Sequence, residues 1–169
     1  MDVIDVTILN ELQKNARATG LEIARGVGLT PPSVGERIRR LENDGIIRGY
    51  AARLDFKKLG KDVLAFIHVS IEFPTFHDSF IQAIQALAAV QECHRVTGVH
   101  AYILKVRVEN TEALDRLLME KIRSIQGVTA TQTSVVLASV KEEVAIPIEG
   151  SFTRAPKGRG GRRRPSLRE

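Results

Sequence analysis

The chain has 169 residues, of which 43% are hydrophobic and 27% charged, a composition typical of a globular protein with a core. Its longest uncharged apolar run, residues 63–71, is far shorter than the roughly 20 residues that a bilayer-spanning helix needs. The acidic N-terminus does not resemble a secretory signal, so we expect a cytoplasmic protein with no membrane partner. One cysteine and four histidines without ligand spacing predict no disulfide, no metal and no cofactor.

Most of the net charge of +5 lies at the C-terminal end. Seven basic residues against Glu169 give residues 150–169 a charge of +6, which leaves −1 for the rest of the chain. Gly, Pro, Ser and Arg dominate this end, so we expect residues 143–169 to form a disordered basic tail. Any DNA affinity of the globular part must then come from a local arrangement of arginines, with unspecific attraction added by the tail.

Three short helices are expected within residues 1–47. Residues 2–14 carry an apolar stripe with helical spacing. Thr19-Gly20-Leu21-Glu22 has the capping-box pattern ahead of a second helix. Thr30-Pro31 has the N-cap and first-turn residues of a third. Three capped helices joined by tight turns match a helix-turn-helix DNA-binding domain.

The third predicted helix has an outward face rich in arginine. The planar guanidinium can pair two-pronged with guanine O6 and N7, which makes arginine suited to reading DNA. An ordinary solvated face is the alternative, but the helix is the last of three capped helices, and that position favours DNA binding. The residues expected to contact double-stranded DNA are Thr30, Pro32, Ser33, Glu36, Arg37, Arg39, Arg40 and Arg48.

A second domain is expected over residues 61–142, after a linker at residues 48–60. Apolar residues alternate along residues 63–71, which predicts a strand. A helix stripe beginning at Phe80, short strands over 91–97 and 101–108, a helix capped by Asn110 or Thr111, and a strand over 128–140 follow. This β-α-β-β-α-β order predicts a ferredoxin-like fold: a four-stranded antiparallel sheet with both helices on one face. The fold class is therefore α+β.

The sheet face away from the helices carries Leu64 and Phe66. A face with such residues is not polar enough to remain in water, so we expect it to pair with a second copy of the chain. A two-fold homodimer also suits a helix-turn-helix that reads two half-sites.

Two separated stretches resemble the leucine-responsive/asparagine regulator (Lrp/AsnC) family of prokaryotic transcription regulators. The first comprises residues 27–34, 37–42 and 45–50, and the second comprises residues 92–98 and 102–106; the likeness covers about residues 1–142. The resemblance implies a winged-type helix-turn-helix, a homodimer or a ring of dimers such as an octamer, and in many members an amino-acid effector bound between subunits. The corresponding effector residues are Gly98, Val99, His100, Ala101 and Tyr102, with Thr131, Thr133 and Ser134 from a neighbouring subunit.

The chain departs from the family at this loop. Members that sense amino acids usually read Gly-Asp-x-Asp-Tyr, whereas this chain has Val99 and Ala101 in place of the acids. An acidic group there would suit an α-amino group, and neither side chain supplies one. We therefore predict that single amino acids at millimolar concentration change the melting temperature little.

Two other functions are considered. Siroheme decarboxylases resemble this family, but their histidine-rich motif would need more than His100 and Tyr102. An architectural DNA-compacting protein is favoured only by the basic tail. Cys93 and His94 do not form a nucleophilic pair, because neighbouring residues of a strand point to opposite faces. The sequence thus predicts a sequence-specific transcription regulator and no enzyme.

Overall fold

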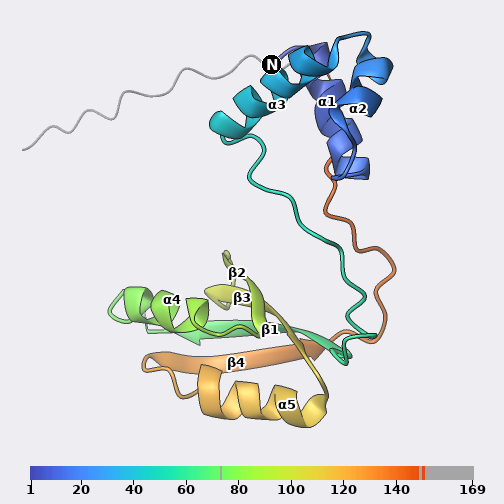
Figure 1. Cartoon of the computed structure of the whole chain (residues 1–169). Coiled ribbons are helices and arrows are strands. Elements are labelled where there is room, and N and C mark those ends of the chain that lie inside the picture. The colour runs from blue at the N-terminus through green and yellow to red at the C-terminus, as the bar shows by residue number, and fades with distance from the viewer. Residues whose placement is uncertain (73, 149, 151–169) are drawn as a thin grey trace, which may run out of the picture. The chain divides into compact units, whose positions relative to one another are not determined.

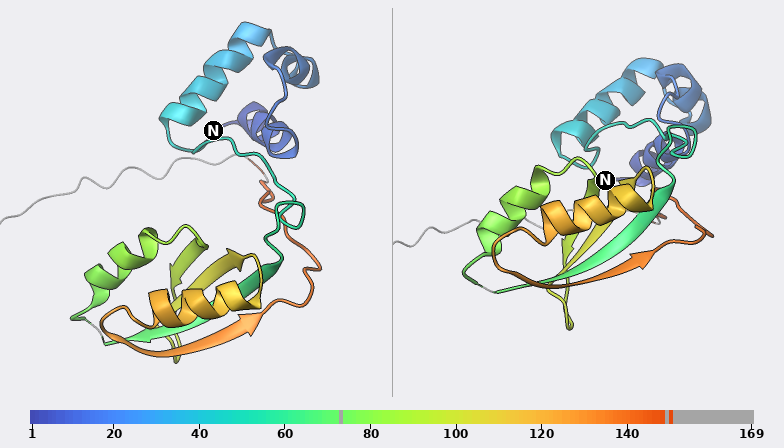
Figure 2. Two further views of the ribbon diagram at one scale, coloured as in Figure 1. Left: turned by 60° about the horizontal axis from the view of Figure 1, so that its bottom comes forward. Right: turned by 90° about the horizontal axis from the view of Figure 1, so that it is seen from below.

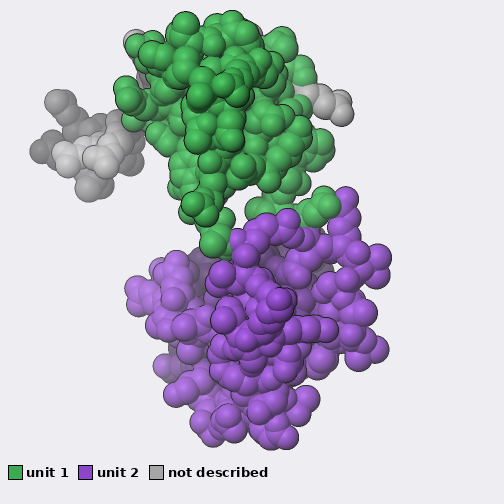
Figure 3. All heavy atoms as spheres, turned by 45° about the vertical axis from the view of Figure 1, so that its right-hand side comes forward, with its two compact units in different colours: residues 1–52, 143–169 green, residues 53–142 purple. Residues whose placement is uncertain are grey.

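The computed structural model describes residues 1–72, 74–148 and 150, and it divides the chain into two compact units. Residues 1–52 and the described residues after 142 form the helical unit, and the described residues of 53–142 form the sheet unit (Figure 3). The expected linker is thus shared, because residues 48–52 belong to the first unit and residues 53–60 to the second. No helix in the described ranges is long and apolar enough to cross a membrane.

The helical unit contains the three predicted helices, α1 (Val3–Lys14), α2 (Gly20–Val27) and α3 (Pro31–Asn43) (Figure 1). The predicted capping box at Thr19 and Glu22 is present, and Thr30 is the N-cap of α3. One apolar face of each helix meets in a shared core of Ile8, Leu9, Ile23, Ala24, Val34 and Leu41. Residues 46–52, which follow α3, adopt neither helix nor strand.

The sheet unit has the predicted element order. It comprises β1 (Val63–Ile71), α4 (His77–Gln85), β2 (Val90–Arg95), β3 (Tyr102–Val108), α5 (Thr111–Arg116), the π-helical turn η1 (Leu117–Ile122) and β4 (Val128–Val135). The strands are antiparallel in the order β2-β3-β1-β4, which confirms the ferredoxin-like topology. Both α4 and α5 cover one face of the sheet (Figure 2). Ala65, Ile67 and Val69 of β1 lie on that face and are buried in the core beneath the helices. The predicted alternation along β1 is therefore also confirmed.

The last strand is shorter than expected. β4 ends at Val135 rather than at residue 140, because it lies at the sheet edge and pairs only with β1. Val135 pairs with Ala65, and the next N–H, that of Val136, donates to the Leu64 carbonyl at 2.9 Å. Because β1 begins one residue before Leu64, no partner remains for residues 137–140.

The sheet face opposite the helices is less bare than expected. Leu64 is only 7% exposed, although it lies on this face. It lines a pocket of about 400 Å³ together with Leu54, Phe56 and Val136, so residues of the same chain already cover it. Of the two residues that argued for a partner, only Phe66 retains partial exposure.

The expected tail does not begin at residue 143, because the residues that follow contact the helical unit. The Gln13 side chain donates to the Ile146 carbonyl at 3.0 Å and accepts from the Ile146 N–H at 2.8 Å. Ile148 packs against the core of the helical unit. The rest of the expected tail, residues 149 and 151–169, lies outside the described residues.

Candidate DNA-binding face and effector loop

The turn that positions α3 depends on Gly28. This residue caps α2 in the left-handed conformation, with φ of 69°, and its N–H donates to the Ala24 carbonyl. Leu29 also donates to Ala24, at 3.1 Å, and Thr30 then starts α3 by accepting from the Ser33 N–H. Three residues between two helices give the short turn of a helix-turn-helix, which leaves α3 with one face in the core and the other exposed.

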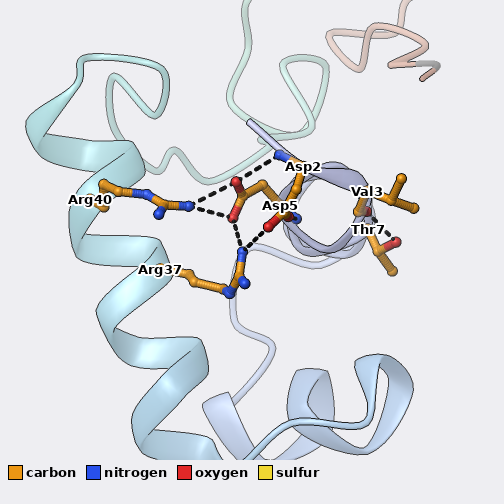
Figure 4. A network of polar contacts seen from close by, with 6 residues as sticks. All are labelled: Asp2, Val3, Asp5, Thr7, Arg37 and Arg40. Carbon is orange, nitrogen blue, oxygen red and sulfur yellow. Dashed lines mark hydrogen bonds and ion pairs between the residues drawn. The ribbon is translucent and has the colours of Figure 1, made fainter. Parts of the chain in front are cut away.

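An ion-pair network links α3 to the N-terminal end of α1 (Figure 4). Asp5 is 1% exposed, and its carboxylate accepts from the Arg37 guanidinium at 2.8 Å and from Arg40 at 2.8 and 2.9 Å. Arg37 also binds Asp2 at 2.7 Å. Asp2 and Asp5 in turn form a capping box, in which each side chain accepts from the other's backbone N–H. Asp5 therefore anchors two arginines of α3 to the first turn of α1.

The network also makes the Asp2 carboxyl easier to deprotonate. The Asp5 backbone N–H, followed by the Arg37 guanidinium, holds the pKa of the Asp2 carboxyl below its ordinary value. No local pattern predicts this network, because Asp5 and Arg37 are 32 residues apart in the chain. An acid at the start of α1 was visible only as a favourable charge near a helix N-terminus.

The predicted DNA-contacting residues therefore fall into a group held by other residues and a group exposed without such contacts. Arg37 is 24% exposed and turns toward α1, whereas Arg40 keeps 56% of its side chain exposed beside the same carboxylate. Thr30 caps the helix. Exposed without such an anchor are Pro32, Glu36, Arg39 and Arg48, with Ser33 half-buried.

A surface hollow of about 460 Å³ follows one stripe of α3. It is lined by Leu29, Ser33, Glu36, Arg37 and Arg40. The anchored arginines thus line an open, largely polar surface of α3.

The expected effector residues lie at the β2–β3 hairpin, but their side chains do not converge. Val99 is 92% exposed at the tip. Tyr102 is 1% exposed, packs on Phe80 in the core and bonds through its hydroxyl to His77 Nδ1 at 2.5 Å. The Tyr102 side chain is therefore not available to a ligand at the loop.

The three β4 residues of the expected effector set also separate. Thr131 and Thr133 pair with Val69 and Ile67, whose side chains face the helices, whereas Ser134 pairs with Phe66 on the opposite face. Residues paired across strands share a face, so one ligand cannot touch all three side chains on a single sheet face. The alternation of side chains along a strand already places residues 133 and 134 on opposite faces, but the expected effector set was taken from the resemblance to the Lrp/AsnC family.

His100 instead joins a polar cluster on the sheet face away from the helices. Its Nδ1 lies 2.9 Å from Ser70 Oγ, and its Nε2 lies 3.2 Å from Gln132 Oε1. The His68 ring lies 5.7 Å from the His100 ring. Ser70 and Gln132 were not predicted as site residues, because their approach to His100 depends on the register that pairs Gln132 with His68.

Cys93 and His94 show no nucleophilic arrangement. Burial raises the pKa of the Cys93 thiol, which keeps it protonated, and His94 pairs with Glu92 at 3.1 Å. Within the described ranges, no group of three or more His, Cys, Asp or Glu residues is placed to hold a metal ion.

Two family models match the two units. A winged helix-turn-helix DNA-binding model matches residues 1–48, and an Lrp/AsnC ligand-binding domain model matches residues 64–146. The leucine-responsive regulatory proteins of Escherichia coli K12 and Klebsiella pneumoniae are each 40% identical over 151 residues, which is 88% of this chain and 92% of theirs.

Solved structures give the same result. The L-methionine complex of a Neisseria meningitidis transcriptional regulator has a TM-score of 0.84 at 31% identity, covering 87% of this chain and 96% of its own. The feast or famine regulatory protein of M. tuberculosis, complexed with L-methionine, has a TM-score of 0.80 at 32% identity, covering 86% and 97%. E. coli AsnC has a TM-score of 0.81 at 29% identity, covering 87% and 99%. The chain belongs to the Lrp/AsnC family of DNA-binding transcription regulators.

Proposed function

We propose that this regulator reads specific DNA sites through exposed residues of α3. The proposal rests on a difference between the charged residues of α3. Asp5 anchors Arg37 and Arg40, while Glu36 and Arg39 stay exposed. An anchored guanidinium suits contact with phosphates through its remaining N–H groups, and an exposed one can reach base edges. Arg39 is thus the arginine that reads bases, and the anchored pair positions the helix.

The experiment combines selection of binding sites from random duplexes with footprinting. Arg39→Ala is expected to cost about 1 to 3 kcal/mol on the best selected site and much less on random DNA. The matched control, Arg116→Ala, removes the same charge from an exposed position of α5 in the other unit. Equal losses for Arg39→Ala on selected and random duplexes would mean that this side chain contacts only the backbone.

The regulator acts as a homodimer or a higher ring of dimers. Phe66 on the sheet face and Leu137, which is 98% exposed just beyond β4, offer apolar surface in the sheet unit. A two-fold contact would bury such residues against their own copies. Sedimentation velocity tests this point, because Phe66→Glu should shift the protein toward monomer while Met119→Glu, at a half-exposed residue of η1, should not.

A small effector binds at the β2–β3 loop, as supported by the methionine complexes of two structural neighbours. The Gln132 amide group and the backbone of the hairpin are the polar groups available there. The loop lacks an acid that would pair with an ammonium group, so a ligand without an α-amino group is favoured, and the 2-oxo acid of each amino acid is the matched test compound. Melting curves with leucine, methionine and their 2-oxo acids distinguish these classes. Ligand at a hundredfold over its Kd adds about 2.7 kcal/mol.

Regulation by this protein involves no catalytic step. Both ring nitrogens of His100 are occupied by Ser70 and Gln132, which leaves this histidine poorly placed for tetrapyrrole chemistry. Absorbance in the porphyrin range after incubation with a siroheme would contradict this part of the proposal.

A further inference from the structure

The two acids that bind the arginines of α3 differ in how deeply they are buried. Asp5 is 1% exposed and accepts from both Arg37 and Arg40. Asp2 is 53% exposed, and its Oδ2 lies 2.7 Å from Arg37 NH1. Breaking a buried ion pair leaves an uncompensated charge in the interior, whereas an exposed pair contributes little net energy. Asp5 is therefore a fixed partner of α3, and Asp2 is a partner that another anion can replace.

One nitrogen of Arg37 contacts both acids (Figure 4). Arg37 NH1 lies 2.7 Å from Asp2 and 2.8 Å from Asp5 Oδ1, and the Arg37 side chain lines the hollow along α3. Two carboxylates against two guanidinium groups make this cluster neutral, so it attracts a phosphate only weakly while Asp2 is in place. A phosphate oxygen accepts charge-assisted hydrogen bonds from a guanidinium just as a carboxylate oxygen does. A DNA phosphate that contacts Arg37 therefore competes with Asp2.

The two oxygens of the Asp2 carboxylate have separate roles. Oδ1 accepts from the Asp5 N–H and so caps α1, while Oδ2 binds Arg37. The Asp5 N–H and the Arg37 guanidinium lower the pKa of the Asp2 carboxyl, so this group is an anion at neutral pH. Asparagine caps a helix about as well as aspartate, because the cap needs only an acceptor oxygen. The charge of Asp2 is thus not required to start α1.

We propose that Asp2 is an autoinhibitory residue of the DNA-binding face, because its carboxylate occupies Arg37 in the free protein and a DNA phosphate displaces it on binding. Asp5 holds Arg37 and Arg40 during this exchange. The competition lowers the affinity for every duplex, since phosphates carry no sequence information, and it leaves base preference to exposed residues such as Arg39. The inference rests on the proposed function, because it takes α3 as the element that meets DNA.

Asp2→Asn tests the proposal by removing the anion while keeping the cap. The variant should bind selected and random duplexes about two- to fivefold more tightly, which is the range that an exposed ion pair supports. Equilibrium titrations of labelled duplexes at one fixed salt concentration measure the change. Unchanged or weaker binding would overturn the proposal.

Glu11→Gln is the matched control. It removes one negative charge from the same helix and releases Lys14, whose Nζ lies 2.7 Å from Glu11 Oε1, instead of an arginine of α3. Glu11 lies about 12 Å beyond Val3 along the helix axis. This distance exceeds the Debye length of about 8 Å at physiological salt. The control should therefore change the affinity little, and a gain equal to that of Asp2→Asn would overturn the proposal.

Arg37→Gln tests whether the effect of Asp2 depends on Arg37. Glutamine keeps a donor for Asp5 but has no charge to be covered. Asp2→Asn should consequently give little or no gain in the Arg37→Gln background, whereas an equal gain in both backgrounds would show general repulsion between Asp2 and DNA and would overturn the proposal. Melting curves check that each variant is folded. If Arg37→Gln unfolds, the comparison of Asp2→Asn with Glu11→Gln still decides the outcome.

Footprints separate the failure of this inference from failure of the proposed function. Asp2→Asn should protect the same bases as the wild-type protein, because the residues of α3 are unchanged. An unchanged affinity together with an intact wild-type footprint would overturn the role of Asp2 and leave the proposed function standing. The absence of any specific footprint from the wild-type protein would overturn the proposed function itself.

Discussion

Asp5 is the buried charged residue of the described core, and its replacement tests the network between α1 and α3 most directly. Asp5→Ala removes the carboxylate that accepts from Arg37 and Arg40, together with half of the capping box with Asp2. The variant leaves the Arg37 side chain, which is 24% exposed, without its buried partner.

The expected loss follows from the burial of each partner. Removing one member of a fully buried ion pair costs about 3 to 5 kcal/mol. Arg37 and Arg40 both keep contact with water and can be partly rehydrated, so we take about half of that range, roughly 2 kcal/mol. Loss of the capping bond adds about 0.5 to 1 kcal/mol. We therefore expect Asp5→Ala to lower the free energy of unfolding of the helical unit by about 2 to 3 kcal/mol.

Hydrogen exchange followed by mass spectrometry provides the assay, because it reports each unit separately in the intact protein. Peptides from α1 and α3 should exchange faster in Asp5→Ala, whereas peptides from β1 and β3 should not change. Glu11→Ala is the control, since it removes an exposed acid paired with Lys14 and should cost at most about 0.5 kcal/mol. A loss below about 0.5 kcal/mol for Asp5→Ala, or equal losses for both variants, would refute the structural role of the network.

Three further outcomes are expected. Gly127→Ala should lower the free energy of unfolding by about 2 to 4 kcal/mol, because the φ of Gly127 is 89° and an added Cβ would lie 2.4 Å from Phe76 Cβ and Cγ. Urea denaturation followed by circular dichroism measures this loss, and a loss below about 1 kcal/mol would contradict the clash. Gly28→Ala meets nothing within 4 Å, so only its φ of 69° should cost, about 1 kcal/mol in the same assay, and a loss as large as that of Gly127→Ala would be inconsistent with strain alone. Hydrogen bonds from Asp5 and Thr19 lower the pKa values of Asp2 and Glu22, so the stability that both carboxylates contribute is present at neutral pH and lost as the pH falls below about 4. Asp2→Asn/Glu22→Gln should flatten this acid dependence in a pH series of melting curves. An unchanged profile would exclude these two groups as its origin.

Local sequence signals determined the elements that the structure contains. Thr19 with Glu22, and Thr30 with Pro31, start α2 and α3 where expected, because a cap needs only a side chain and backbone groups within one turn. The bounds of β1 followed from strict alternation over residues 63–71. The order of elements then restricted the sheet to one common topology.

Only the tertiary structure decided which side chains meet across the chain. Arg37 looked free on an exposed helix face, and its partner Asp5 lies 32 residues away in the sequence. The end of β4 depended on where β1 begins, and the His100 cluster depended on the register between β1 and β4. Ile146 and Ile148 looked like part of a tail, yet they contact α1 across more than 130 residues. Such contacts carry no periodic signal, because they arise between surfaces that folding alone brings together.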